Sequence, residues 1–164
     1  MRFYSKKTFQ LDKTIINKIL NLKESYWKFG IKSQRQFFLN NIKKEDIHNL
    51  LFINSRLVGY TLLKNMKIKQ SDRLINYLHF DTFIIDEKYR SMNYSPKLMQ
   101  FNNSIIKKKK SFSILLCEND MLEYYSKFNW VKINKRLIAS IKKKKNYMIY
   151  NKQLKCKFYF ISNS

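Results

Sequence analysis

The sequence predicts a mixed α/β fold in which one mixed sheet carries helices on both faces. Apolar residues near the N-terminus recur at helical spacing. Two apolar runs further along are separated by only three residues, which is typical of a hairpin. Strand-like and helical segments then alternate towards the C-terminus. The chain has 164 residues, the usual length of one domain, and it contains no linker or internal repeat, so a single domain over 1–164 is predicted.

Two helices are predicted in the first quarter of the chain. Asp12 is the expected N-cap of the first helix, which ends near Gly30. Its apolar positions follow helical spacing: Leu11, Ile15, Ile16, Ile19, Leu20 and Leu22. A second, shorter helix is expected from Ser33. The segment before the first helix is basic but has no apolar stretch after it, which argues against a secretory signal.

The next segments predict a hairpin followed by a long strand. Asn54-Ser55-Arg56 separates the apolar runs 47–53 and 57–63, and this turn lacks the usual glycine. A polar stretch, 67–73, is expected as a connection before a strand over 75–85.

A polar segment over 86–95 leads into a helix from about Pro96 to Lys110. Proline suits the first turn of a helix because the N–H that it lacks would have no partner there. The remaining elements are expected in this order: strand 112–117, helix 120–128, strand 130–134, and two strands over 137–150 and 155–161.

The chain carries 34 basic and 11 acidic residues, a net charge of +23. Such a charge attracts polyanions. The chain is also rich in Asn and Ile, however, a composition typical of AT-rich coding, in which lysine takes over generic surface positions. No run reaches the ~18 apolar residues of a membrane span, so no membrane partner is expected. Cys117 and Cys156 match no metal-ligand spacing. Reduced thiols, a cytoplasmic location and no metal are therefore predicted.

One short segment gives the first indication of a chemical function. The long strand and the following helix are joined by Ile85-Asp86-Glu87-Lys88-Tyr89-Arg90-Ser91-Met92-Asn93-Tyr94-Ser95. It resembles the phosphate loop of the GNAT superfamily of acyl-CoA-dependent N-acyltransferases, which reads Arg or Gln, two residues, Gly, one residue, then Gly or Ala. Arg90 matches the start, while Asn93 and Ser95 occupy the two glycine positions. Asparagine is the next best residue for a positive φ.

A second segment, 119–130, is similar to the Asn-x-x-Ala-x-x-x-Tyr-Glu-Lys-x-Gly-Phe box of the same family. Asn129 replaces the glycine that ends the helix in the left-handed conformation, and Trp130 replaces the final aromatic. The two segments and their context cover roughly Ile47 to Asn134. Three residues match the box in register: Asn119, Tyr125 and Lys127.

The resemblance implies a GNAT-like fold, a central mixed and mostly antiparallel sheet flanked by helices on both faces. It also implies acetyl-CoA, or another acyl-CoA, as co-substrate. The pantetheine arm would pair with strand backbone, like an added strand, and Asn119 would hydrogen-bond this arm or instead serve as a helix N-cap. Backbone N–H groups at the helix N-terminus would bind the pyrophosphate. The implied cofactor residues of the strand and loop are Phe83, Ile84, Ile85, Arg90, Ser91, Met92, Asn93, Tyr94 and Ser95.

The resemblance also implies catalytic residues. The family often places its general base eleven residues before the loop arginine, which is His79 here, and histidine suits this role near neutral pH. Asp81 would lie on the same strand face and orient the imidazole or act as the base itself. Tyr125 occupies the position of the general acid that protonates the CoA thiolate. The alternatives are a hydrogen-bonded strand histidine and a packed helix tyrosine.

The implied activity is direct transfer of an acetyl or other short acyl group from acyl-CoA to a primary amine of a small molecule, for example an amino sugar, by a monomer or homodimer. The alternative is an inactive GNAT-like module that binds nucleic acid through its basic surface. The missing loop glycines favour this alternative, whereas Arg90, Asn119 and Tyr125 argue against it.

Overall fold

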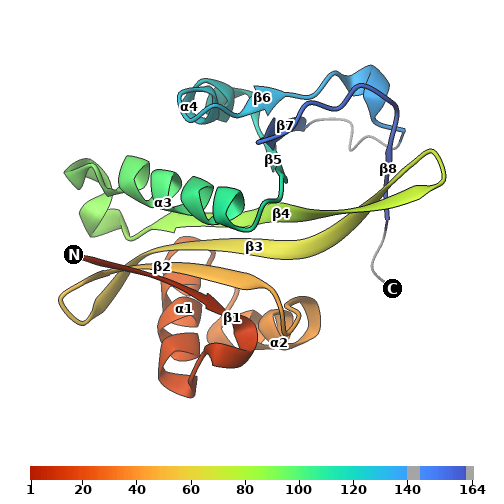
Figure 1. The fold of residues 1–164 in the computed structure, drawn as a ribbon. Coiled ribbons are helices and arrows are strands. Elements are labelled where there is room, and N and C mark those ends of the chain that lie inside the picture. The colour runs from red at the N-terminus through yellow and green to blue at the C-terminus, as the bar shows by residue number, and fades with distance from the viewer. Residues whose placement is uncertain (140–144, 162–164) are drawn as a thin grey trace. The chain divides into compact units, whose positions relative to one another are not determined.

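The protein divides into two compact units, and the computed structural model describes residues 1–139 and 145–161 (Figure 1). Unit 1 comprises Met1–Lys64 and Thr82–Asn102, and unit 2 comprises Asn65–Asp81 and Asn103–Ser164. Three elements contribute residues to both units: strands β3 (Arg56–Gln70) and β4 (Arg73–Ile85) and helix α3 (Tyr94–Lys108). None of the described helices is long and apolar enough to cross a bilayer.

The predicted mixed α/β fold is confirmed. The described residues form eight strands in one mostly antiparallel sheet. In unit 1, β1 (Arg2–Lys7) pairs with β2 (Ile47–Ile53), and β2 pairs with β3. In unit 2, β4 runs parallel to β5 (Ser113–Cys117), which pairs with β7 (Asn146–Tyr150). The other strands of unit 2 are β6 (Val131–Lys132), which pairs with β7, and β8 (Tyr159–Phe160), which pairs with β3.

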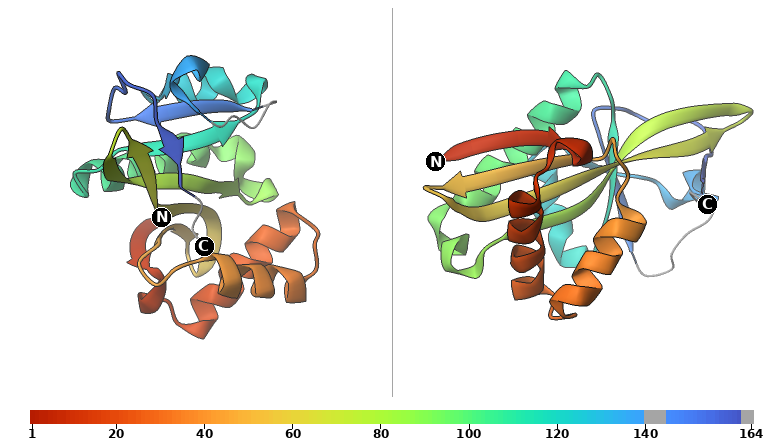
Figure 2. Two further views of the ribbon diagram at one scale, coloured as in Figure 1. Left: turned by 90° about the vertical axis from the view of Figure 1, so that its right-hand side faces the viewer. Right: turned by 90° about the horizontal axis from the view of Figure 1, so that it is seen from below.

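One face of the unit 1 strands is covered by α1 (Lys13–Tyr26) and α2 (Ile31–Asn41), which lie across the strands in the view from below (Figure 2). Asp12 caps α1 as predicted, since its Oδ1 accepts a hydrogen bond from the Ile15 N–H at 2.8 Å. Both helices bury apolar side chains against the strands, and the fully or nearly fully buried members of this core are Ile19, Leu20, Leu22, Phe38, Ile42, Leu50, Leu57, Tyr60, Leu62 and Ile84.

The opposite face of unit 1 is covered by the first part of α3. Leu98 of this helix packs against side chains that alternate with those of the first face, among them Leu51, Val58 and Ile85. Gly59 permits this close packing, because a Cβ atom here would lie 2.9 Å from both Ile85 Cδ1 and Leu98 Cδ2. Helices therefore cover both faces of the sheet, as the sequence predicts.

Unit 2 has its own apolar core, built from the outer ends of β3 and β4 and from β5, β7 and the C-terminal segment. The prediction of a polar connection over 67–73 is wrong, because β3 continues to Gln70 and β4 begins at Arg73. Met66 and Ile68 point into this core while Lys67 and Lys69 face solvent. This alternation is that of a strand, and the lysines obscure it.

Several element boundaries also differ from the prediction. Strand β1 precedes the first predicted helix, and its residues are mostly polar. The helix expected over 120–128 is a turn of 3₁₀ helix followed by α4 (Leu122–Ser126). The strand expected over 137–150 includes 140–144, which lie outside the described residues, and its described part begins at Asn146.

His48 is a fully buried histidine of unit 1. Thr8 Oγ1 donates to the Lys43 carbonyl, so it accepts from the His48 Nε2–H at 2.9 Å. The other nitrogen, Nδ1, then accepts from the Tyr60 hydroxyl at 2.8 Å. The neutral imidazole thus satisfies both partners. Burial, followed by the nearby positive charge of Lys23, lowers the pKa of His48 from 6.5 to about 3.

We therefore expect the free energy of unfolding to fall as the pH falls below about 6.5, because only the unfolded chain then binds a proton at His48. At pH 5 the loss is about 2 kcal/mol, from a shift of about 1.5 units in the relevant range. Urea unfolding at pH 7 and pH 5 measures it. His48→Gln should flatten this dependence, whereas His79→Gln should not, and equal slopes in all three proteins would contradict the assignment.

Candidate functional site

The segment that follows β4 is anchored at Asp86. The Asp86 N–H donates to the Val58 carbonyl at 2.8 Å, and its Oδ2 pairs with the Arg56 guanidinium at 2.8 Å. The other carboxylate oxygen accepts from the Lys88 N–H at 3.1 Å, which starts a 3₁₀ helix over Glu87–Met92. The loop therefore leaves the sheet from a fixed point.

Asn93 ends this 3₁₀ helix in the left-handed conformation, with φ 55° and ψ 31°, and α3 begins at the next residue. The conformation is the one that the resemblance requires of a glycine at this position. Ser91, Met92 and Asn93 are exposed, and Tyr94 and Ser95 are half-buried. Because α3 is a 15-residue helix, its N-terminus provides backbone N–H groups and a positive dipole end for an anion.

Arg90, the first residue of the predicted motif, lies against two groups of unit 1. Its Nε donates to the Ile85 carbonyl at 3.4 Å, and its guanidinium lies 5.2 Å from the centre of the Tyr26 ring. Tyr26 is the last residue of α1, and nothing in the sequence indicates this pairing. This cation–π contact joins the loop to the C-terminal end of α1.

Phe83, Ile84 and Ile85 are the last three residues of β4 before the loop. Ile84 and Ile85 point to opposite faces of unit 1 and are both buried in its cores. Among the described residues, the parallel ladder between β4 and β5 ends at the pair Phe80 and Leu115, five residues before β4 ends. The side chains of Ile84 and Ile85 are committed to the cores of unit 1.

His79 and Asp81 lie on β4 within unit 2, and the structure brings their side chains close together. His79 Nδ1 lies 3.2 Å from the Ile114 carbonyl of β5, and because a carbonyl only accepts, Nδ1 carries the proton. Nε2 lies 3.8 Å from Asp81 Oδ1. This separation is too long for a direct hydrogen bond, although the two residues lie on the same face of β4.

Tyr125 is buried on α4 within unit 2. Its ring contacts Phe80, the strand neighbour of His79, with ring centres 6.3 Å apart, and Trp130 at 6.2 Å. The backbone N–H of Trp130 also donates to the Tyr125 carbonyl at 3.3 Å. Asn129, which lies between α4 and Trp130, adopts the predicted left-handed conformation with φ 64°. These contacts fix the ring of Tyr125 in one orientation.

Asn119 does not act as the helix N-cap that was one of its two predicted uses. Its Oδ1 accepts a hydrogen bond from Asn146 Nδ2 of β7 at 2.7 Å, and neither adjoining helix receives a side-chain cap. This pairing fixes the amide and leaves its N–H₂ group for other contacts. Cys117, the last residue of β5, is buried, and burial above all raises the pKa of its thiol, so it is poorly suited to act as a nucleophile.

The predicted residues fall in both units. Unit 1 holds the strand Phe83–Ile85 and the loop Arg90–Ser95, and unit 2 holds His79, Asp81, Asn119 and Tyr125. No group of three or more His, Cys, Asp or Glu residues in the described part of the chain is placed to hold a metal ion.

No family sequence model and no curated protein matches the chain by sequence, whereas solved structures match its fold. An acyl-CoA N-acyltransferase from Pseudomonas aeruginosa aligns with a TM-score of 0.68 at 12% identity, over 91% of this chain and 99% of that one. The aminoglycoside 6′-N-acetyltransferase from Enterococcus faecium gives a TM-score of 0.65 at 10% identity, over 90% and 96%.

A third similar structure is the PaiA N-acetyltransferase from Thermoplasma acidophilum in complex with coenzyme A, with a TM-score of 0.56 at 14% identity, over 91% of this chain and 98% of that one. At such identities the likeness concerns the fold, and it extends over nearly the whole length of each protein. The chain thus has the fold of the GNAT acyl-CoA N-acyltransferases, as its two sequence segments indicate.

Proposed function

We propose that the protein is an N-acyltransferase that moves an acetyl or other short acyl group from acyl-CoA to the primary amine of a small molecule. The conformation of Asn93 is the observation that carries this proposal. Its positive φ supports, without glycine, a turn of the kind that a phosphate-binding loop would need, in a chain whose fold is that of acyl-CoA N-acyltransferases. An amino sugar is the acceptor that we would test first, because an aminoglycoside acetyltransferase shares this fold.

Acyl-CoA would bind through unit 1. The N–H groups of Ser91 to Ser95 would receive the pyrophosphate, and the backbone of Phe83 to Ile85 would pair with the pantetheine arm. The loop residues are mostly exposed and the two isoleucine side chains are committed to the cores, which suits contacts made by backbone alone. A backbone N–H on this strand would also stabilise the developing oxyanion on the thioester carbonyl.

His79 would act as the general base through Nε2. Its Nδ1–H is directed at the Ile114 carbonyl, so the neutral ring presents the lone pair of Nε2 to an amine. In this step the amine nitrogen forms a bond to the thioester carbon, its proton passes to Nε2, and the carbon–sulfur bond breaks. Asp81, 3.8 Å from Nε2, would stabilise the imidazolium that forms.

Tyr125 would complete the reaction by giving its hydroxyl proton to the departing thiolate. The fixed orientation of its ring between Phe80 and Trp130 supports a positioned acid. Tyr124, its neighbour in sequence, is only half-buried and provides a natural comparison.

The same proposal places the enzyme in the cytoplasm, where the free thiols of Cys117 and Cys156 would stay reduced.

The alternative of an inactive module rested on the missing loop glycines. Asn93 adopts the conformation for which glycine is usually required, so this departure from the family pattern no longer favours loss of function. The direct test is incubation with acetyl-CoA and a panel of primary amines that includes amino sugars, with release of free CoA thiol and the mass of the acetylated amine as readouts. Thiol release without an acetylated product would count against transfer.

Asn93→Val should weaken acetyl-CoA binding at least about tenfold, because a β-branched residue resists a positive φ and would distort the loop. Asn93→Gly should bind as well as the original protein, since glycine accepts this conformation freely. Calorimetry measures both. Asn129→Val is a matched control, with the same kind of strain at φ 64° outside the loop. If Asn129→Val weakens binding as much as Asn93→Val, the effect is general destabilisation and not loss of a phosphate site.

A further inference from the structure

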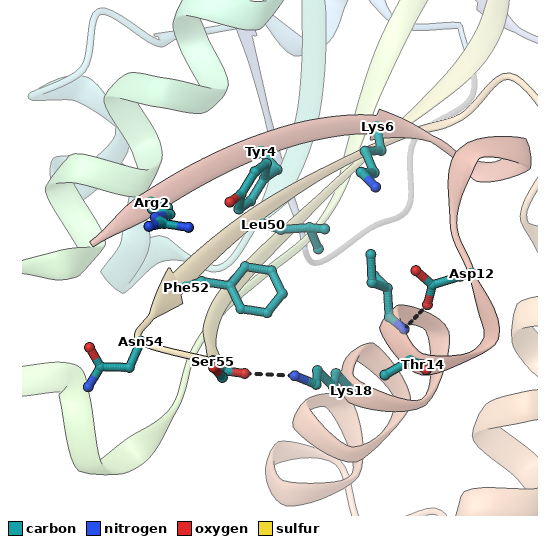
Figure 3. Close-up of a pocket in the computed structure, with 11 residues that line it drawn as sticks. Arg2, Tyr4, Lys6, Asp12, Thr14, Lys18, Leu50, Phe52, Asn54 and Ser55 are labelled. Atoms are coloured by element: carbon teal, nitrogen blue, oxygen red, sulfur yellow. Dashed lines mark hydrogen bonds between the residues drawn. The ribbon is translucent and has the colours of Figure 1, made fainter.

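A cavity of about 280 Å³ lies in unit 1 where β1 and β2 face the start of α1 (Figure 3). It shares no residue with the strand and loop proposed for acyl-CoA. Arg2, Tyr4 and Lys6 contribute to it from β1, since alternate residues of a strand point to the same face. Figure 3 shows these three side chains directed from the strand towards Phe52 and α1.

The charges around this cavity are strongly unbalanced. Arg2, Lys6 and Lys18 are basic, and none of the three forms an ion pair with a carboxylate in the described part of the chain. Asp12 is the single acidic residue among the lining residues, and its Oδ1 already accepts the capping hydrogen bond from the Ile15 N–H. Three cations with one committed carboxylate favour an anion that carries more than one negative charge, such as a phosphate monoester.

The floor of the cavity is apolar and aromatic. Leu50 and Phe52 of β2 belong to the core that α1 and α2 cover. In the pairing with the edge strand β1, Leu50 lies opposite Tyr4 and Phe52 lies opposite Arg2. The Tyr4 and Phe52 rings meet edge to face, with centres 5.8 Å apart and an interplanar angle of 80°. Tyr4 is nevertheless 40% exposed, so its ring remains accessible. Such a surface suits a flat ring system.

Lys18 connects the charged and aromatic parts of the cavity. Its Nζ donates to the Ser55 carbonyl at 2.7 Å and lies 5.5 Å from the centre of the Phe52 ring. The ammonium group is thereby held over the aromatic floor, where a ligand with both a ring and an anion would meet it. A volume of about 280 Å³ is at the lower limit of ligand pockets and suits one ring system with a single phosphate.

We propose that this cavity binds a small aromatic phosphate monoester of the nucleoside monophosphate class, with the phosphate on Arg2, Lys6 and Lys18 and the base against Tyr4 and Phe52. The site would be separate from the acyl-CoA loop, so the two proposals stand or fall independently.

The test is calorimetric titration with adenosine 5′-monophosphate, adenosine and inorganic phosphate, each at about 150 mM salt so that exposed charges are screened. We expect the monophosphate to bind at least about tenfold more tightly than either fragment, because both halves of the cavity then contribute. The double variant Arg2→Gln/Lys6→Gln should lose at least about tenfold in affinity. Phe52→Leu should weaken the monophosphate but leave the affinity for inorganic phosphate unchanged.

Lys13→Gln is the matched control, because Lys13 is an exposed lysine of α1 that does not line the cavity. It should bind the monophosphate normally, and so should Asn93→Val. No binding at millimolar monophosphate would overturn the proposal, as would an equal loss in Lys13→Gln. Loss of monophosphate binding in Asn93→Val would place that ligand at the acyl-CoA loop and would overturn it as well.

Discussion

Tyr125→Phe should lower kcat for acyl transfer by about 10²-fold or more while the dissociation constant for acetyl-CoA changes by no more than about twofold. Phenylalanine keeps the buried ring and its contacts with Phe80 and Trp130, so the fold and the ligand site are preserved. Only the hydroxyl group is removed. The thiolate must then leave without protonation, which slows the chemical step and not binding. Steady-state kinetics combined with calorimetry separate the two effects.

The control for this variant is Tyr124→Phe. Tyr124 is the sequence neighbour of Tyr125, and its ring contacts Tyr125 and Phe128. We expect kcat within about twofold of the original protein. Equal losses in the two variants would show that the tyrosines have packing roles, and an unchanged kcat in Tyr125→Phe would remove Tyr125 from the mechanism.

His79→Gln should lower kcat/KM by about 10²-fold to 10⁴-fold, the usual contribution of a general base. Glutamine preserves a donor towards the Ile114 carbonyl, which His79 reaches at 3.2 Å, but it has no basic nitrogen. The original protein should lose activity as the pH falls, because only the neutral imidazole accepts a proton. In His79→Gln this acidic limb of the pH profile should disappear.

Asp81→Asn distinguishes the two candidates for the base. If Asp81 only stabilises the imidazolium from 3.8 Å, the variant should keep most activity and retain the acidic limb. A larger loss in Asp81→Asn than in His79→Gln, with the acidic limb gone, would instead make the carboxylate the base.

The sequence has only two glycines, and its fold is nevertheless predictable because asparagine occupies positions that usually need glycine. Asn54, Asn93 and Asn129 all adopt positive φ, at the hairpin turn, the loop and the end of the α4 segment. Each stands where a turn or a family pattern favours glycine, and asparagine tolerates this conformation best among the other residues. The motif positions could therefore be assigned even though the glycines themselves are absent.

Contacts between distant segments could not be predicted. Arg90 meets Tyr26 across 64 positions, and Asn119 meets Asn146 across 27, and neither pair leaves a local pattern in the sequence. Strand β1 has no clear local signal for a related reason, because only its pairing with β2 shows that these mostly polar residues form an edge strand. The basic lining of the β1 cavity follows from that pairing.

Titration of the protein with acetyl-CoA by calorimetry at about 50 mM and about 500 mM salt is the most direct test of the acyltransferase assignment. We expect saturable binding of one acetyl-CoA per chain whose affinity persists at the higher salt, because a shaped loop contributes backbone hydrogen bonds that salt screens poorly. Absence of binding, or binding that is lost at the higher salt as non-specific polyanion binding is, would contradict the assignment.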